Sequence, residues 1–282
     1  MLARRMLVIN ADDFGIAPGV NRGIAEAFGA GTLSSVSMMV TTPAFHAAAA
    51  LARDSMPGVG VGLHLDLLTC VPRAGVTSLT DPITGRFRSL TELAARAFAG
   101  QVAAADVRSE CDAQIAALKA EGITPTHVDS HRHTHALPGI LPAVVASARA
   151  AGVRVVRRPL DVMSVTDPVA SAKMIALHAS WRVALSGVDA PGIALLGRSP
   201  HFRGIALQGA PDVQARILTM LDRIPTGSTE LMLHPGYDDA ILARQDPYRA
   251  EREREVAALT SAPVRERLAG GDIELVHFGQ LA

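Results

Sequence analysis

Short, nearly continuous apolar runs alternate along the chain with longer segments of helical periodicity. The first run covers residues 6–11, and beyond Pro18 the apolar residues Val20, Ile24 and Ala27 recur at helical spacing. A run of this length is typical of a strand buried on both faces of a parallel sheet, and proline is common in the first turn of a helix. The pattern therefore predicts a strand followed by a helix, which ends near Gly29.

The same alternation continues along the rest of the chain. Further strands are predicted at residues 34–40, 59–65, 123–129, 153–157, 229–233 and 273–277, and further helices at residues 43–53, 90–98, 104–121, 137–151, 171–185 and 212–221, with one or two charged helices within 247–268. Residues 66–88, rich in Pro, Gly and Thr, are predicted to form a long loop, and residues 187–209 show no strong periodicity. Strands that alternate with helices favour a parallel sheet with right-handed crossovers. We therefore predict an α/β fold, a single domain over residues 1–282, and a TIM-like barrel of about seven strands in preference to an open sheet.

The composition excludes several classes of function. The 27 basic residues balance the 27 acidic ones, and aromatic residues make up 4% of the chain, so neither nucleic acid nor an acidic membrane is an expected partner. Cys70 and Cys111 have no paired spacing, which excludes a disulfide framework and a thiolate zinc site. The N-terminal apolar run is too short for a signal peptide, and no stretch reaches the roughly 18 apolar residues of a membrane helix. We expect a cytoplasmic protein that acts on small substrates.

Histidine is concentrated in one stretch, where four of the ten histidines and Asp129 fall within residues 126–135. If this stretch were a strand, His131, His133 and His135 would share one face, because side chains alternate along a strand. Neutral imidazole is the commonest metal ligand in proteins, so the cluster suggests a divalent metal site. A polar loop whose histidines bond backbone groups is the alternative.

Polar groups elsewhere in the chain favour the metal site. Asp12 and Asp13 follow the first predicted strand, His64 lies at the end of the third, and His234 follows a late one. The carboxyl ends of parallel barrel strands share one face, so these groups are expected to meet the histidine cluster there. One carboxylate with two imidazoles leaves coordination positions open for water and substrate, as a catalytic metal requires.

The two adjacent aspartates suggest a division of labour between a metal ligand and a general base, and a protonated His234 is suited to protonating a leaving group. Zinc suits imidazole ligands, whereas magnesium or manganese suits a shell richer in oxygen. The sequence does not choose between these ions.

Four motifs together resemble the YdjC-like family of carbohydrate deacetylases, which includes chitooligosaccharide deacetylases. They are Asn10-Ala11-Asp12-Asp13-Phe14-Gly15, Gly62-Leu63-His64, the run from Pro125 to His135, and His234-Pro235-Gly236, in the order and spacing of that family. The resemblance implies an incomplete TIM-like barrel related to those of polysaccharide deacetylases. It further implies one divalent ion, zinc or magnesium, held by Asp13, His64 and His131.

In the same family resemblance, Asp12 corresponds to the catalytic base and His234 to the general acid. His133 and His135 are expected to contact the ligands or the substrate, with Asp129 orienting one of them, and Arg132 and Phe14 join this substrate-facing set. The implied reaction is hydrolysis of an N-acetyl group from a short chitin-type sugar, which gives acetate and a free amine. The small acetylated sugar is the expected partner, and a homodimer is compatible with the family.

Two other functions remain as alternatives. A phosphoesterase or amidohydrolase on a similar barrel usually carries a His-x-His pair on its first strand, where this chain has Asp12 and Asp13, and only Arg132 adds a basic group among the ligands. A non-catalytic sugar-binding protein would need neither a base nor an open metal position. Metal content and metal-dependent turnover distinguish these readings.

Overall fold

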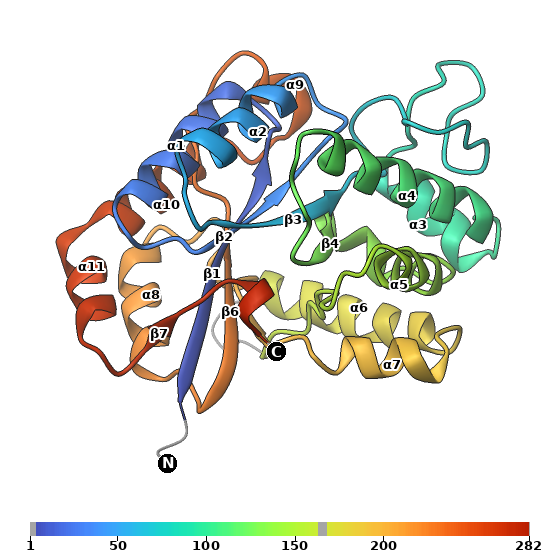
Figure 1. Cartoon of the computed structure of the whole chain (residues 1–282). Coiled ribbons are helices and arrows are strands. Elements are labelled where there is room, and N and C mark those ends of the chain that lie inside the picture. Colours follow the sequence, from blue (N-terminus) through green and yellow to red (C-terminus); the bar gives the residue numbers. More distant parts are fainter. Residues whose placement is uncertain (1–3, 163–167, 282) are drawn as a thin grey trace.

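The computed structural model describes residues 4–162 and 168–281 and places one curled parallel sheet at the centre of the molecule (Figure 1). The strands are β1 (Arg5–Phe14), β2 (Ser35–Met38), β3 (Gly60–Leu65), β4 (Val128–Ser130), β5 (His201–Arg203), β6 (Gly227–Leu233) and β7 (Glu274–Leu275). Their order is β4-β3-β2-β1-β6-β5, with β7 also paired to β1. Within the described residues no strand ladder joins β4 to β5, so the prediction of an incomplete TIM-like barrel is confirmed.

Helices surround this sheet on its outside. They are α1 (Pro18–Gly29), α2 (Phe45–Asp54), α3 (Leu90–Phe98), α4 (Ala104–Ala120), α5 (Leu141–Ala150), α6 (Pro168–Leu185), α7 (Ala190–Leu196), α8 (Val213–Asp222), α9 (Leu242–Gln245), α10 (Ala250–Thr260) and α11 (Ala262–Ala269), with 3-10 turns at His131–Ala136 and Phe278–Gln280. Figure 1 shows α1, α8, α10 and α11 on one side of the sheet and α4 to α7 on the other. None of the helices in the described residues is long and apolar enough to cross a membrane.

The side chains of β1 alternate between two hydrophobic cores, one on each face of the sheet. Leu7 and Ile9 belong to the large core between the sheet and the helices. Val8 points the other way and packs with Val155 and Phe278 inside the curled sheet. Because side chains alternate along a strand, Asn10 and Asp12 continue the inward face above Val8, and there the interior becomes polar. This polar end of the barrel carries the candidate site.

One edge of β1 is shared by two strands. Asn10 and Ala11 pair with β2, whereas Met6 and Leu7 pair with β7. The other edge pairs with β6 along residues 5–11. The final segment of the chain therefore completes the lower part of the sheet, below the level at which β2 begins.

The sequence pattern was wrong in three places. The strand predicted at 153–157 contributes only an isolated bridge between Val156 and Val128, and the strand predicted at 123–129 is shortened to β4. Residues 187–209, which lack periodicity, contain α7 and the three-residue β5. A strand of three residues is too short to show alternation, so its existence depends on the partner strand β6.

Candidate metal centre and active site

An irregularity at the end of β1 brings two consecutive aspartates to the same site. The pairing of β1 with β2 shifts between Ala11 and Phe14, and Asp13 has a φ of 66°. In a regular strand the side chains of Asp12 and Asp13 would point to opposite faces. The local bulge and the left-handed backbone of Asp13 let both carboxylates face the interior.

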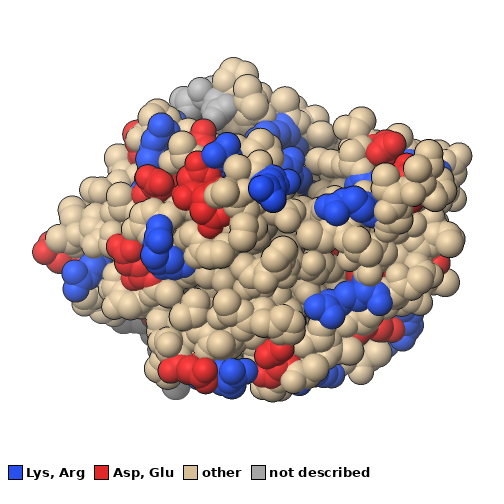
Figure 2. Space-filling view, turned by 90° about the horizontal axis from the view of Figure 1, so that it is seen from above, with Lys and Arg blue, Asp and Glu red and all other residues tan. Residues whose placement is uncertain are grey.

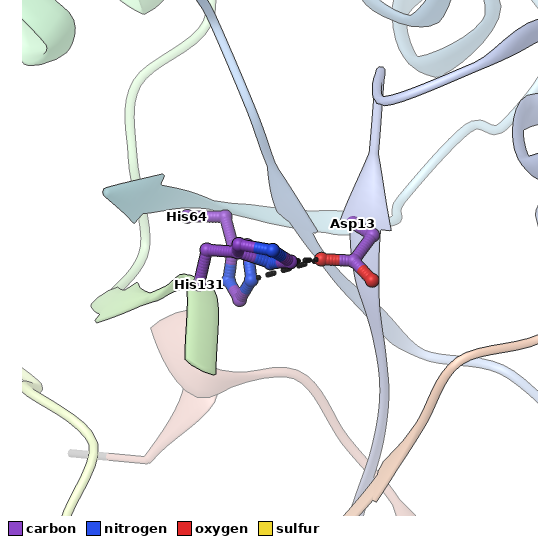
Figure 3. A group of neighbouring side chains, drawn as sticks. All are labelled: Asp13, His64 and His131. Carbon is purple, nitrogen blue, oxygen red and sulfur yellow. Dashed lines mark hydrogen bonds and ion pairs between the residues drawn. The ribbon is translucent and has the colours of Figure 1, made fainter. Parts of the chain in front are cut away.

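Asp13 faces two imidazoles that come from other strand ends (Figure 3). Its Oδ1 lies 2.8 Å from Nδ1 of His131 and 3.2 Å from Nε2 of His64. All three side chains are buried. Burial by itself would raise the pKa of Asp13, but the charges of His131 and Arg252 outweigh it and hold that pKa well below its usual range.

This donor set fits a divalent cation. Ligand atoms around an ion at about 2.1 Å lie roughly 3 Å apart, which is close to the separations of Asp13 Oδ1 from the two imidazole nitrogens. The charges also favour a cation. Of the described residues, the buried carboxylates around this centre include Asp12, Asp13, Asp129, Glu230, Asp246 and Glu255, and the buried guanidinium groups are Arg157 and Arg252. The carboxylates outnumber the guanidinium groups, so a dication would offset an excess of buried negative charge.

A second carboxylate orients His64. Asp129 Oδ1 lies 2.8 Å from His64 Nδ1, which fixes Nδ1 as the protonated nitrogen and leaves Nε2 toward Asp13. Burial by itself would lower the pKa of His64, but Asp129 and Asp12 raise it to about 10. Ser37 in β2 donates a 2.6 Å hydrogen bond to Oδ2 of Asp129, so the strand beside β1 holds this pair in place. Asp129 was expected to orient His133 or His135, and the structure places it against His64 instead.

Arg157 is the central cation of the site. Nη1 and Nη2 each lie 2.7 Å from an oxygen of Asp12, and Nη1 also lies 2.7 Å from Asp129 Oδ2. Nη2 and Nε both contact Oε1 of Glu230, at 2.6 and 2.8 Å. The five N–H donors of the guanidinium group are thus used by three carboxylates. Burial raises the pKa of Glu230 to about 7 despite this contact.

The histidine cluster is not a strand. β4 ends at Ser130, and His131–Ala136 forms a 3-10 turn in which Arg132 and His133 have φ values of 52° and 56°. The premise that His131, His133 and His135 share a strand face is therefore wrong. Asp13, Arg132 and His133 are the non-glycine residues of positive φ in the described part of the chain, and all three lie at or beside the site. Left-handed backbone at such residues is typical of functional sites.

The other predicted residues around the ligands have separate environments. The ring of His133 lies edge-on to Phe202, with its buried Nδ1 unpartnered in the described structure. His135 is buried, with Nδ1 bonded to Ser130 Oγ and Nε2 bonded to the carbonyl of Arg157. Both of its nitrogens are therefore used within the protein.

Two members of the predicted substrate-facing set lie outside the metal cluster. Phe14 is fully buried in the apolar core. Arg132 is exposed and contacts Asp246 at 3.4 Å. Phe14 therefore packs in the core behind the end of β1, and Arg132 lies at the surface.

His234 lies next to Asp12 at the strand ends. Leu233, the last residue of β6, pairs with Ala11, so His234 and Asp12 each directly follow a residue of this pair. The His234 backbone N–H donates to Glu255 Oε2, and its ring packs edge-on against Tyr248 at 5.6 Å between centroids. Tyr248 donates its hydroxyl to the other oxygen of Glu255 at 2.5 Å. Glu255, on α10, thus anchors the turn that carries His234.

Sequence reasoning missed Arg157, Glu230, Asp246 and Arg252. Arg157 ends the strand predicted at 153–157, so its position at a carboxyl end was a signal of the same kind that identified His64. Arg252 donates a 2.6 Å bond to Asp13 Oδ2 but lies in a helix rich in charged residues, where the pattern resembles a solvated face. Only the fold shows that this guanidinium group is buried.

The chain is similar to known proteins over nearly its whole length. A family model described as YdjC-like protein matches residues 6–270. A carbohydrate deacetylase of Geobacillus stearothermophilus is 34% identical over 97% of each chain, and a human carbohydrate deacetylase is 34% identical over 99% of this chain and 91% of its own. A solved Enterococcus faecalis structure, whose description proposes cleavage of cellobiose phosphate, superimposes with a TM-score of 0.78, 28% identity and 99% coverage of both chains. With the family model and full-length relatives in agreement, the chain belongs to the YdjC-like family.

Proposed function

We propose that this protein is a metal-dependent carbohydrate deacetylase that hydrolyses the N-acetyl group of a short sugar containing N-acetylhexosamine. The observation that carries the proposal is the pair of neighbouring aspartates, of which Asp13 faces His64 and His131 while Asp12 is held by Arg157. A ligand set beside a separately anchored carboxylate is what amide hydrolysis by water requires. The names of the full-length relatives support the same reaction.

Asp13, His64 and His131 would hold the divalent ion. When bound, such an ion polarises the acetyl carbonyl and lowers the pKa of water. Asp12 takes a proton from the attacking water, and Arg157 together with Asn10 fixes the direction of its oxygens. His234 gives a proton to the nitrogen as the carbon–nitrogen bond breaks. In the whole reaction, a bond from the water oxygen to the carbonyl carbon forms first, the carbon–nitrogen bond then breaks, and the products are acetate and an amine.

The surface charge is compatible with a small sugar substrate. Figure 2 shows Lys and Arg interspersed with Asp and Glu on one face, separated by wide areas without charge. The chain as a whole has a formal net charge of +0. A mixed surface of this kind gives no broad basic field for a long polyanion. Hydrogen bonds and ring contacts within the site are the expected means of sugar recognition.

Acetate release tests the proposal directly. Diacetylchitobiose and N-acetylglucosamine are incubated with protein of known zinc, magnesium or cobalt content, and the released acetate and free amine are both measured. The two products are expected in equal amounts. We expect release that depends on metal and that is lost in Asp13→Ala, because this variant removes the oxygen shared by the two imidazoles. Asp238→Ala, an exposed position paired with Arg249, is the control for general effects of removing an aspartate.

A second candidate is hydrolysis of a phosphorylated disaccharide, which the description of the Enterococcus faecalis structure favours. Cellobiose phosphate is therefore included in the same assay, and both inorganic phosphate and reducing sugar are measured. Release of either from cellobiose phosphate, with no acetate from the acetylated sugars by metal-loaded protein, would replace the deacetylase proposal.

A further inference from the structure

Both imidazoles that face Asp13 have a carboxylate on the far side of the ring. His64 has Asp129, at 2.8 Å from Nδ1. The Nε2 of His131 lies 3.4 Å from Oδ2 of Asp246, which follows α9 and is only 5% exposed. The arrangement around His131 thus repeats the arrangement around His64, with a carboxylate from a distant part of the chain.

The chemistry of imidazole gives Asp246 a specific task. A neutral imidazole carries one proton, and a ring nitrogen that ligates an ion cannot be the one that carries it. Nδ1 is the nitrogen of His131 that faces Asp13. Ligation through Nδ1 therefore puts the ring proton on Nε2, and Asp246 Oδ2 is the acceptor that faces this atom.

Asp246 is itself held so that one oxygen remains for His131. Its Oδ1 accepts a 2.7 Å hydrogen bond from the backbone N–H of Tyr248 and lies 3.4 Å from Nη2 of Arg132. Its own backbone N–H bonds to the carbonyl of Leu242. These contacts anchor Oδ1 and the backbone, and Oδ2 faces His131 at 3.4 Å, with Nη2 of Arg252 farther away at 3.9 Å.

We propose that Asp246 is a positioning residue that fixes the ring orientation and the metal-binding tautomer of His131. Arg252, six residues on, binds Asp13 Oδ2 and leaves Asp13 Oδ1 toward the imidazoles. Segment 246–252, beyond His234 in the chain, thereby orients two of the three ligands. The inference rests on the metal site of the proposed function, and it concerns metal binding rather than the identity of the substrate.

Titration with Co²⁺, followed by its visible absorption, tests this role without any substrate. We expect Asp246→Ala to bind Co²⁺ about 10–100-fold more weakly than the wild type, with a smaller loss for Asp246→Asn, whose amide oxygen still accepts a hydrogen bond. Asp238→Asn, an exposed position paired with Arg249, should leave the affinity unchanged. Thermal unfolding of the metal-free proteins shows whether each variant folds.

A second measurement compares the protonation of the histidine rings in the wild type and in Asp246→Ala. In ¹⁵N-labelled protein loaded with Zn²⁺, long-range proton–nitrogen spectra of the histidine rings report which nitrogen is protonated, and His131→Gln assigns the signal. We expect a protonated Nε2 and a metal-bound Nδ1 for His131. A merely structural role of Asp246 would leave both the tautomer and the chemical shift of the His131 Nε2 proton unchanged in Asp246→Ala, whereas the proposal predicts that this proton loses its hydrogen-bonded shift.

Three results separate the possible failures. Co²⁺ affinity of Asp246→Ala within about threefold of wild type, or a metal-bound Nε2 in His131, would overturn the role of Asp246 alone. Wild-type protein that binds neither Co²⁺ nor Zn²⁺ would overturn the metal site and with it both proposals. Tight wild-type binding that is weakened in Asp246→Ala, without acetate release, would support this inference and reject only the proposed reaction.

Discussion

Arg157 and Asp12 form a bidentate ion pair, with Nη1 and Nη2 each 2.7 Å from a different carboxylate oxygen of Asp12. Both side chains are buried, and the same guanidinium group reaches Asp129, which in turn orients His64. One cation therefore links the proposed base to the proposed metal ligands. Changes at this position should affect both parts of the site at once.

Arg157→Lys is expected to lower kcat for acetate release by at least about 100-fold, because an ammonium group cannot bind both oxygens of Asp12 in a fork. The variant should also lose about 1–3 kcal/mol of unfolding free energy, because the three N–H donors of lysine cannot replace the five by which Arg157 binds the buried carboxylates. Steady-state kinetics and urea unfolding measure the two effects. Arg154→Lys, at an exposed position nearby, is the control. A near-normal kcat in Arg157→Lys would show that the function of Asp12 does not depend on a bidentate contact.

Asp12→Asn should separate chemistry from metal binding. The amide keeps the size of the side chain but cannot take a proton from water, so kcat is expected to fall by about 100-fold to 10,000-fold. Elemental analysis should find the same metal content as in the wild type, because Asp12 is not among the three proposed ligands. Full activity in this variant would assign the base to another residue.

Asp129→Asn tests the orientation of His64. The amide offers one acceptor oxygen where the carboxylate contacts His64, Ser37 and Arg157 with two. We expect metal affinity to fall by about 10–100-fold, as is usual when the hydrogen-bond partner of a ligating histidine is lost. Calorimetric titration with Zn²⁺ measures this loss. Exposed Asp112→Asn on α4 should bind Zn²⁺ as the wild type does.

Gly62→Ala should destabilise the protein through a contact with His127. A Cβ atom at Gly62 would lie within 2.5 Å of three ring atoms of His127, and that ring is buried against Phe278. Overpacking of this kind costs about 1–3 kcal/mol. The thermal midpoint should fall by several degrees, whereas Gly75→Ala, with open space around it, should change little. An unchanged midpoint in Gly62→Ala would mean that His127 can move aside.

The buried histidines predict acid sensitivity. Burial lowers the pKa of His135 from 6.5 to about 4 and that of His127 to about 3. Because the unfolded chain binds these protons more readily, the stability that neutral His135 contributes is present above pH 6.5 and is lost as the pH falls to about 4, an effect on the order of 3 kcal/mol. Urea unfolding of metal-free protein across this range should show a smaller pH dependence in His135→Gln than in the wild type.

His46→Gln, at an exposed position, should keep the pH dependence of the wild type. Parallel curves for the wild type and His135→Gln would contradict the assignment of this acid sensitivity to His135.

The sequence by itself determined the order of the main helices and strands, the barrel, and the strand ends that carry Asp12, Asp13, His64, His131 and His234. Hydrophobic periodicity is a local property, and the carboxyl ends of parallel strands share one face whatever the loops do. Tertiary structure alone decided the three-residue β5, the single bridge at Val156 and the left-handed turn after Ser130. It also decided the burial of Arg252 and the approach of Asp246 to His131. These features depend on contacts between residues far apart in the chain, and the local pattern of hydrophobic and polar positions contains no record of such contacts.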